Sequence, residues 1–151
     1  MPTITPFLWF DSQAEEAMNF YASIFKRSKV VSVSRAQGKV MAVQFELEGQ
    51  PVMALNGGPH FTFNESFSLF VGCETQQEID EYWSKLTADG GAPGRCGWLK
   101  DKYGLSWQIV PTALSRMLGD KDPGKAGRVM SAMMQMNKLD LNKLQQAYGG
   151  E

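Results

Sequence analysis

The sequence predicts an α+β fold in which paired βαβββ modules form a curved mixed sheet around a cleft, followed by a C-terminal helical tail. The main observation is an internal repeat: a shift of 62 positions places Asp11 on Cys73 and Ile24 on Leu86. A second observation is that both halves show the pattern of a strand, a helix and then two or three antiparallel strands. Neither half could cover its own sheet, so pairing of the halves predicts about eight strands with helices outside.

The first half is expected over residues 1–57. Residues 4–10 predict an aromatic-rich strand, with Pro6 at an edge or bulge because proline donates no hydrogen bond. A helix follows, with Asp11 or Ser12 as its N-cap. The buried face of this helix has the three-and-four spacing typical of an amphipathic helix and comprises Ala14, Ala17, Met18, Tyr21 and Phe25. Strands are expected at residues 30–35, 40–48 and 51–56.

The second half is expected over residues 66–111, after a loop at 57–65. It begins with a strand at 66–71 and a helix at 76–88 that ends at Gly90 and Gly91. Residues 96–111 then predict a strand, a turn closed by Gly104 and a second strand stopped by Pro111. In that second strand Gln108 shares a face with Ser106 and Val110, which directs one amide into whatever the sheet encloses.

Residues 1–111 are therefore expected to form one domain of two repeats, and residues 112–151 a helical extension. Helices are predicted at 112–118, 124–136 and 141–148, and the second of these is rich in methionine. Methionine-rich helices often cover hydrophobic seams or partner surfaces. Whether this helix covers the sheet of its own subunit or packs across a dimer stays open.

The composition is that of a soluble globular protein, with 43% hydrophobic and 21% charged residues and a net charge of −1. No lysine or arginine run stands out, so neither nucleic acid nor a membrane surface is expected as a partner. Two cysteines are too few for a disulfide framework, and we expect a reduced cytoplasmic protein. No signal peptide or membrane span is expected from the apolar pattern.

Three stretches resemble the vicinal oxygen chelate superfamily: Ile-Thr-Pro-Phe-Leu-Trp-Phe-Asp, Ala-Glu-Glu-Ala-Met-Asn-Phe-Tyr and Tyr-Gly-Leu-Ser-Trp-Gln-Ile-Val-Pro. That superfamily includes glyoxalase I, extradiol dioxygenases and bleomycin-resistance proteins. The tail, with Asp-Pro-Gly-Lys-Ala-Gly-Arg-Val-Met-Ser-Ala-Met, is similar to the PhnB-like branch labelled 3-demethylubiquinone-9 3-methyltransferase. The fold hosts several chemistries. A methyl-donor site would need a glycine-rich strand-to-helix turn, and the sequence around Gly57 and Gly58 lacks that context.

The resemblance implies a metal site of two histidines and two carboxylates, or one glutamine, in the cleft. The implied positions fall near Thr5 or Pro6, near Ala54 (with Asn56 as the nearest polar neighbour), near Phe67 or Ser68, and on Gln108. None of them is a histidine or a carboxylate, so the sequence predicts no metal and no cofactor. Glu46, Glu48 and Asp101 are interpreted as a solvated strand face and as turn chemistry.

Without a metal, the predicted cleft is aromatic and carries a few neutral hydrogen-bonding groups. The candidate ligand-binding residues are Thr5, Trp9, Asn56, His60, Trp98 and Gln108. This set favours a metal-free binding protein for an aromatic or lipophilic small molecule, working as a homodimer. The alternative is a glyoxalase-like lyase or isomerase, or a dioxygenase-type enzyme, on a small oxygenated substrate, with a cryptic metal or His60 as proton carrier. Cys73 and Cys96 are interpreted as small buried hydrophobic residues.

Overall fold

The computed structural model describes residues 1–151, which divide into two compact units, Met1–Phe63 and Asn64–Glu151. Each unit has its own four-stranded sheet, and the strand orders are β1-β4-β3-β2 and β5-β8-β7-β6. When β1 to β4 are matched in turn with β5 to β8, the two strand orders are identical, so the two sheets have the same topology. The predicted α+β fold of two βαβββ modules is confirmed, with the eight strands distributed over two sheets.

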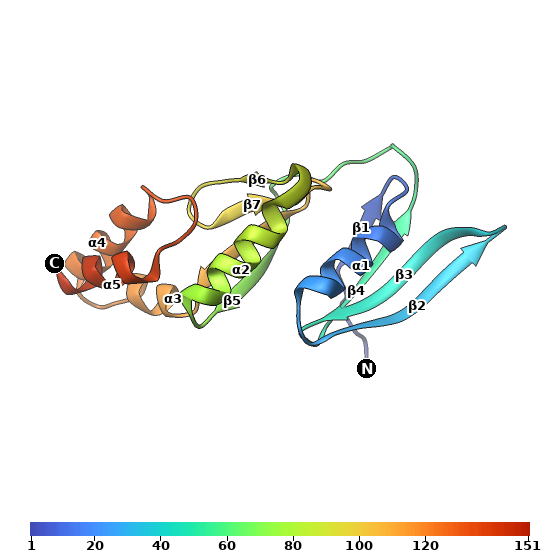
Figure 1. Ribbon diagram of the computed structural model, residues 1–151. Helices are drawn as coiled ribbons and strands as arrows, with labels where there is room; N and C mark the ends of the chain where they lie inside the picture. Colours follow the sequence, from blue (N-terminus) through green and yellow to red (C-terminus); the bar gives the residue numbers. More distant parts are fainter. The chain divides into compact units, whose positions relative to one another are not determined.

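The first unit follows the predicted order closely. Its elements are β1 (Phe7–Phe10), α1 (Ala14–Ile24), β2 (Ser28–Ala36), β3 (Lys39–Leu47) and β4 (Gln50–Asn56). Strand β1 is an edge strand parallel to β4, whereas β2, β3 and β4 are joined in antiparallel pairs. Helix α1 lies along one face of this sheet (Figure 1).

The N-terminus of α1 is capped differently from the prediction. Neither Asp11 nor Ser12 is the N-cap: Gln13 holds that position and its side chain makes no capping hydrogen bond. Instead the side-chain oxygen of Asn56 accepts a hydrogen bond from the backbone N–H of Ala14 at 2.8 Å. Asn56 is the register partner of Phe10, so the parallel pairing brings the end of β4 to the start of the helix.

The core of the first unit lies between α1 and the sheet. Alternate strand residues point toward the helix, and the buried ones include Leu8, Phe10, Val43, Phe45, Leu47, Val52 and Ala54. The rings of Tyr21 and Phe45 stack with centroids 6.4 Å apart. Residues of the alternate set lie on the opposite face, where Phe7 is 51% exposed.

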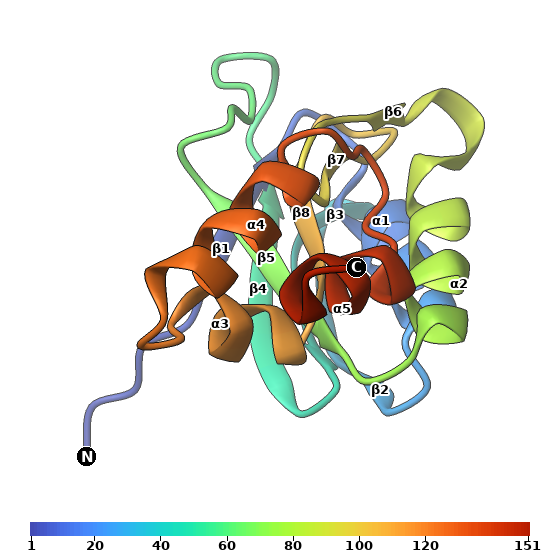
Figure 2. The ribbon, with the colours of Figure 1, turned by 90° about the vertical axis from the view of Figure 1, so that its left-hand side faces the viewer.

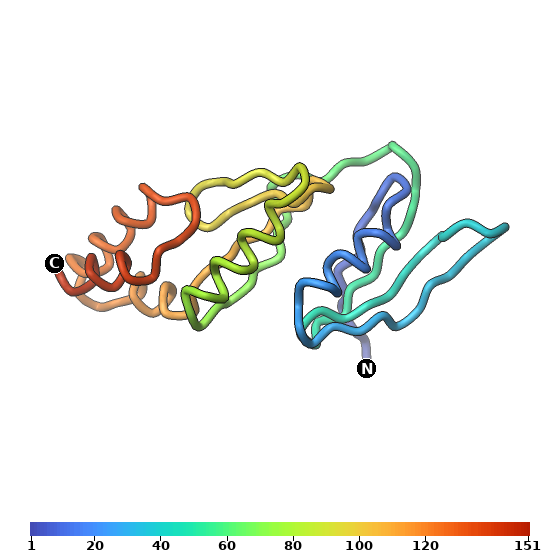
Figure 3. The backbone as a smooth tube through the Cα atoms, in the orientation of Figure 1, coloured from blue at the N-terminus to red at the C-terminus, as the bar shows by residue number.

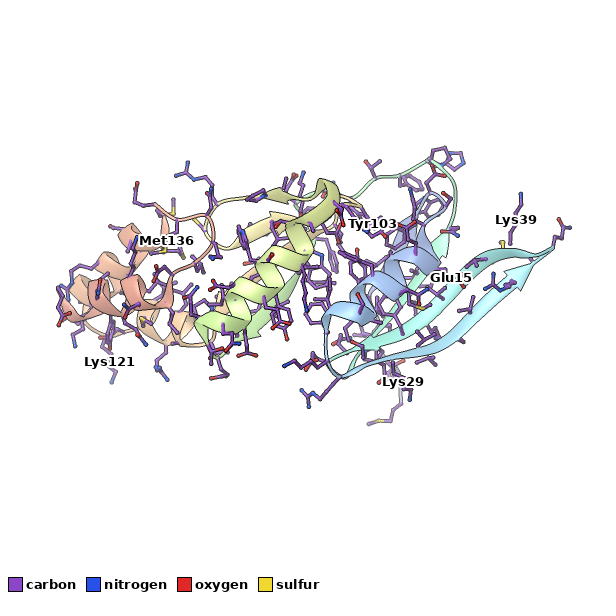
Figure 4. The ribbon with its side chains drawn as sticks, viewed as in Figure 1. Glu15, Lys29, Lys39, Tyr103, Lys121 and Met136 are labelled. Carbon is purple, nitrogen blue, oxygen red and sulfur yellow. The ribbon has the colours of Figure 1, made fainter.

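The β2–β3 hairpin extends beyond α1 (Figure 3). Strand β2 is the sheet edge, and Val30 and Val31 on it are 46% and 49% exposed. An ion pair from Arg35 to Glu15, 2.8 Å long, joins the hairpin to α1. Lys39 lies near the hairpin tip, and both Glu15 and Lys39 are labelled in Figure 4.

The second unit repeats the module and adds the tail. Its first elements are β5 (Ser68–Cys73), α2 (Gln76–Thr87), a 3₁₀ turn η1 (Ala88–Gly90), β6 (Ala92–Pro93), β7 (Trp98–Lys100) and β8 (Ser106–Pro111). Helix α2 starts with a capping box between Thr75 and Glu78. It ends three residues before Gly90, which has φ 112° after Asp89 at φ 56°.

A buried carboxylate organises the turn between β7 and β8. Asp101 is 2% exposed and accepts hydrogen bonds from the backbone N–H groups of Tyr103 and Leu105 and from the indole N–H of Trp107, at 2.8, 3.1 and 2.9 Å. Figure 4 marks Tyr103 at this turn. The prediction of turn chemistry for Asp101 is confirmed, and the carboxylate also anchors a core indole.

The tail consists of α3 (Ala113–Leu118), α4 (Pro123–Met133) and α5 (Leu141–Gly149), which group together in Figures 1 and 2. These helices build their own core, which comprises Val110, Leu114, Met117, Val129, Leu139 and Leu144. The side chain of Gln76 donates to the carbonyl of Leu139 and accepts from the N–H of Leu141, which ties α2 to the tail. Much of the tail's apolar surface is therefore buried within its own unit.

The methionines of α4 and of the residues just after it divide between two environments. Met133 and Met136 pack against the tail core, whereas Met130 and Met134 are 45% and 48% exposed. None of the helices has the length and apolar character needed to cross a membrane.

Candidate functional site

The site lies on the face of the second sheet opposite α2. Leu99 and Trp107 are both 2% exposed on the α2 side, so their neighbours in sequence face the other way. The register places Lys100 beside Ser106 and Ser106 beside Ser68, and these three make a polar row across the strands. We call this the open face of the second sheet.

An aromatic row runs next to the polar one. Trp98 pairs with Gln108, and Gln108 pairs with Phe70, which is 62% exposed. Trp98 and Gln108 were both predicted as ligand-binding residues, and the structure makes them cross-strand neighbours on one face.

A cavity of about 550 Å³ opens beside these rows. Its walls come from the loop that precedes β5, from β6 and the turn after it, and from β7 and β8. The lining residues are Glu65, Ala92, Pro93, Gly94, Arg95, Trp98, Leu99, Lys100 and Ser106. The volume lies in the range of small-molecule sites, which is about 300–1,000 Å³. We call this cavity the Trp98 pocket.

One residue that lines the pocket, Ser106, has an unsatisfied polar atom. Ser106 is 1% exposed, and its hydroxyl oxygen is buried with no hydrogen-bond partner. A buried polar group without a partner costs about 1–3 kcal/mol. Such an atom in the wall of a cavity indicates a position where a ligand group would complete the hydrogen bonding.

The charges at the pocket come from three side chains. Lys100 forms an ion pair with Glu65, whose side chain is 62% exposed. The hydrogen bond from Lys100 is the main reason that the pKa of the Glu65 carboxyl lies below its usual value. Arg95 also lines the pocket and donates to the carbonyl of Met134 at 3.1 Å.

The same face allows a test of the metal site that the superfamily implies. The resemblance implies a histidine near Phe67 or Ser68 and a carboxylate on Gln108, and of these Ser68 and Gln108 are the polar residues. They do lie together, because the side-chain nitrogen of Gln108 donates to the hydroxyl of Ser68 at 3.0 Å. A hydroxyl and a neutral amide are weak ligands for the divalent metals that prefer imidazole and carboxylate, so these residues do not fit the metal. In residues 1–151 no cluster of three or more histidine, cysteine, aspartate or glutamate side chains could hold a metal ion.

The other predicted ligand-binding residues belong to the first unit. Trp9 is half-buried, donates its indole N–H to the carbonyl of Gly58 at 2.9 Å, and contacts Phe61 edge-to-face at 5.0 Å between ring centroids. A Cβ on Gly57 would lie 2.2 Å from the Trp9 ring, so glycine is required there for the indole to fit.

Thr5, Asn56 and His60 have different surroundings. The amide of Asn56 lies on the α1 side of its sheet, where it accepts from Ala14 and donates to the carbonyl of Val40 at 3.2 Å. His60 is exposed in the loop after β4, and Thr5 is half-buried in the segment before β1. Binding roles for these three residues stay predictions.

The two cysteines also differ. Cys73 is fully buried, and burial, helped by Glu78 and Glu74, raises the pKa of its thiol to about 12. Its prediction as a small buried hydrophobic residue is confirmed. Cys96 is half-buried, and its sulfur lies 3.8 Å from that of Met134.

The sequence interpretation missed Ser106, Lys100 and Glu65. The signal for Ser106 was available, since the alternation of 105–110 places it on the same face as Gln108. Lys100 and Glu65 could not be found in that way, because their role depends on strand register and on the path of a loop.

The module topology and the similar solved structures define the class of protein: the chain has the vicinal oxygen chelate fold. The fosfomycin-resistance protein FosX from Listeria monocytogenes is 15% identical, with a TM-score of 0.58, and the match covers 79% of this chain and 98% of that one. A glyoxylase/bleomycin resistance protein/dioxygenase domain from Frankia is 13% identical with a TM-score of 0.50, over 74% of this chain and 93% of that one.

A narrower classification comes from a family model: residues 2–110 match the model of the family 3-demethylubiquinone-9 3-methyltransferase. The chain belongs to this PhnB-like family. A PhnB protein from Bacillus cereus is 41% identical with a TM-score of 0.67, and the match covers 72% of this chain and 99% of that one. No curated protein matches the chain.

Proposed function

We propose that this chain is a metal-free binding protein for an aromatic or lipophilic small molecule. The observation that carries the proposal is the Trp98 pocket, which has a volume of about 550 Å³ and one aromatic residue, Trp98, in its wall. Ligand sites are mostly apolar cavities with a few placed polar groups, and Trp98 and Ser106 supply that combination. Gln108, next to Trp98 in register, adds a neutral amide close to the pocket.

The proposal does not include methyl transfer, although the family bears the name of a methyltransferase. The sequence has no glycine-rich strand-to-helix turn of the kind that a dinucleotide-type methyl-donor site needs. It also does not include metal-assisted chemistry, because Phe67 or Ser68 and Gln108 stand where the resemblance implies a histidine and a carboxylate.

Binding can be tested with a neutral fluorescent probe, N-phenyl-1-naphthylamine. We expect its fluorescence to rise on binding and the melting temperature of the protein to increase with probe concentration, with no effect of EDTA on either quantity. Trp98→Ala should raise the Kd by about tenfold or more, because it removes an aromatic contact worth about 0.5–1.5 kcal/mol in addition to its buried area.

The matched control is Trp83→Phe, because Trp83 is buried on α2 and does not line the pocket. This variant should bind the probe like the wild type. Equal probe affinity of wild type and Trp98→Ala would contradict the proposal. Stoichiometric zinc, nickel or iron in freshly purified protein would instead support the enzyme alternative on a small oxygenated substrate.

We also propose that the protein is a homodimer. Support comes from large apolar side chains left exposed, because such side chains mark association surfaces where they form a contiguous patch. Those above 45% exposure within the strands, in the β4–β5 connection and on the tail include Phe7, Val30, Val31, Met41, Phe61, Phe70 and Met134. Sedimentation equilibrium at micromolar concentration should give twice the mass of the chain, and a monomer across that range would contradict the proposal.

A further inference from the structure

We infer that the Trp98 pocket takes a small aromatic carboxylate, whose anionic head group binds between Lys100 and Ser106. This inference rests on the proposed function, because it names the class of ligand that the same pocket would bind. The groups that carry it are the buried Ser106 hydroxyl, the Lys100 ammonium and the Glu65 carboxylate, and no metal is needed.

The hydroxyl of Ser106 is unpartnered. Ser106 is 1% exposed and lines the pocket, and its oxygen has no hydrogen-bond partner. A hydroxyl both donates and accepts, so by itself it does not specify the charge of a ligand. The charge of the preferred ligand therefore depends on the residues around this hydroxyl.

Lys100 faces Ser106 across the β7–β8 pair. Directly paired residues on one face have Cβ atoms about 4.5–5.5 Å apart. The long, flexible stem of Lys100 lets its ammonium turn toward the Ser106 hydroxyl, so that both groups can donate to the two oxygens of one carboxylate. Hydrogen bonds between charged partners are shorter and stronger than neutral ones, so this pair favours an anion over an amide or an alcohol.

The carboxylate of Glu65 already contacts the Lys100 ammonium at the pocket wall. The Glu65 side chain is 62% exposed, and the residue precedes β5 in a loop. An exposed ion pair contributes little to stability, so exchanging one carboxylate for another costs little. The Glu65 carboxylate thus binds the Lys100 ammonium in the way that a ligand carboxylate would, and it competes with the ligand for that ammonium.

Trp98 is placed to contact the rest of the ligand. Trp98 lies two residues before Lys100 on β7 and is half-buried on the same face, so it can contact the flat apolar body of a ligand whose head group reaches Lys100. Arg95 adds a second positive charge to the lining. Arg95 and Lys100 against Glu65 leave a net positive charge, which also favours an anionic ligand.

The experiment compares 2-naphthoate with 2-naphthamide, which share a ring system and differ in charge. By isothermal titration calorimetry we expect naphthoate to bind at least about tenfold more tightly than naphthamide. Lys100→Met should remove this preference by weakening naphthoate binding about tenfold and leaving naphthamide binding unchanged. Ser106→Ala should weaken naphthoate binding while the melting temperature of the free protein stays equal or rises, because the variant removes a buried hydroxyl that has no partner.

Glu65→Gln gives the sharpest result, because it should tighten naphthoate binding. The control is Glu81→Gln, which removes the same charge from an ion pair on α2, where Lys85 donates to Glu81 at 2.8 Å. The control should leave both affinities unchanged. Weaker or unchanged naphthoate binding in Glu65→Gln would overturn the competition by Glu65.

The outcomes separate this inference from the proposed function. Equal affinity of the wild type for naphthoate and naphthamide would overturn the inference and leave the proposed function intact. Binding of neither probe, together with no response to N-phenyl-1-naphthylamine, would overturn both.

Discussion

Replacing Asp101 by alanine should strongly destabilise the second unit. The carboxylate is 2% exposed and accepts two backbone N–H groups and one indole N–H, none longer than 3.1 Å. A hydrogen bond to a charged group contributes about 1.5–3 kcal/mol, and the removal of a shared acceptor leaves buried donors without partners. Because the three bonds share one residue and are not additive, we expect a loss of about 4 kcal/mol.

A matched pair of variants tests this reasoning. Asp101→Asn keeps an oxygen for the N–H groups of Tyr103 and Leu105 but places an amide nitrogen beside the indole of Trp107. We expect it to cost about 2 kcal/mol, roughly half the alanine value. The same Asp101→Asn change should cost much less in a Trp107→Phe background, because the indole donor is then absent.

The assay is urea unfolding followed by far-UV circular dichroism, with native-state amide exchange at Leu105 as a local readout. Faster exchange at Leu105 in Asp101→Ala would show that the turn itself has opened. A cost below about 1 kcal/mol for Asp101→Ala, or equal costs of Asp101→Asn in both backgrounds, would refute the role of this carboxylate.

Three further predictions follow from single positions. Gly57→Ala should destabilise the first unit by about 1–3 kcal/mol in urea unfolding, because its Cβ would overlap the ring of Trp9, and an unchanged midpoint would contradict this. Gly127→Ala should raise stability by about 0.5–1 kcal/mol, since the site lies inside α4 and a Cβ there meets no atom within 4 Å. At pH 8 a thiol reagent should label native protein at Cys96 and not at Cys73, because burial raises the pKa of the Cys73 thiol to about 12. The stabilisation from this buried thiol is present below about pH 8.5, the approximate pKa of the thiol in the unfolded chain, and is lost as the pH rises toward 12. Cys73→Ala should therefore reduce the fall in stability over that pH range.

The repeated module could be predicted because its signals are local. The spacing of apolar residues and the glycines that follow place the second helix at 76–88, and the structure has it at Gln76–Thr87. The three tail helices were also predicted from the residues that interrupt or end them, which include Gly119, Pro123, Gly149 and Gly150. Hydrophobic periodicity and turn signals involve residues close together in the sequence, so a single sequence is enough to predict these helices.

The cap of α1 could not be predicted in that way. Asn56 and Ala14 are 42 residues apart, and their contact depends on the parallel pairing of β1 with β4. Asp11 and Ser12 have the right chemistry for a cap, but tertiary contact overrides local preference at this helix. The same register effect produces the Trp98 pocket, where Lys100 meets Ser106 only through the β7–β8 pairing.

The helices that follow Pro111 limit how far the chain can be shortened. The family match stops at residue 110, yet Val110 is already part of a core completed by Leu114 and Val129. The backbone N–H groups of Cys96 and Gly97 also donate to the carbonyls of Met136 and Asn137, at 2.8 Å each. A protein that ends at the family boundary would expose apolar core side chains such as Val110. The backbone N–H groups of Cys96 and Gly97 would also lose their acceptors, next to the loop that borders the Trp98 pocket. Such a fragment should precipitate or lose the pocket, so residues 111–151 have to be retained in any biochemical work on this site.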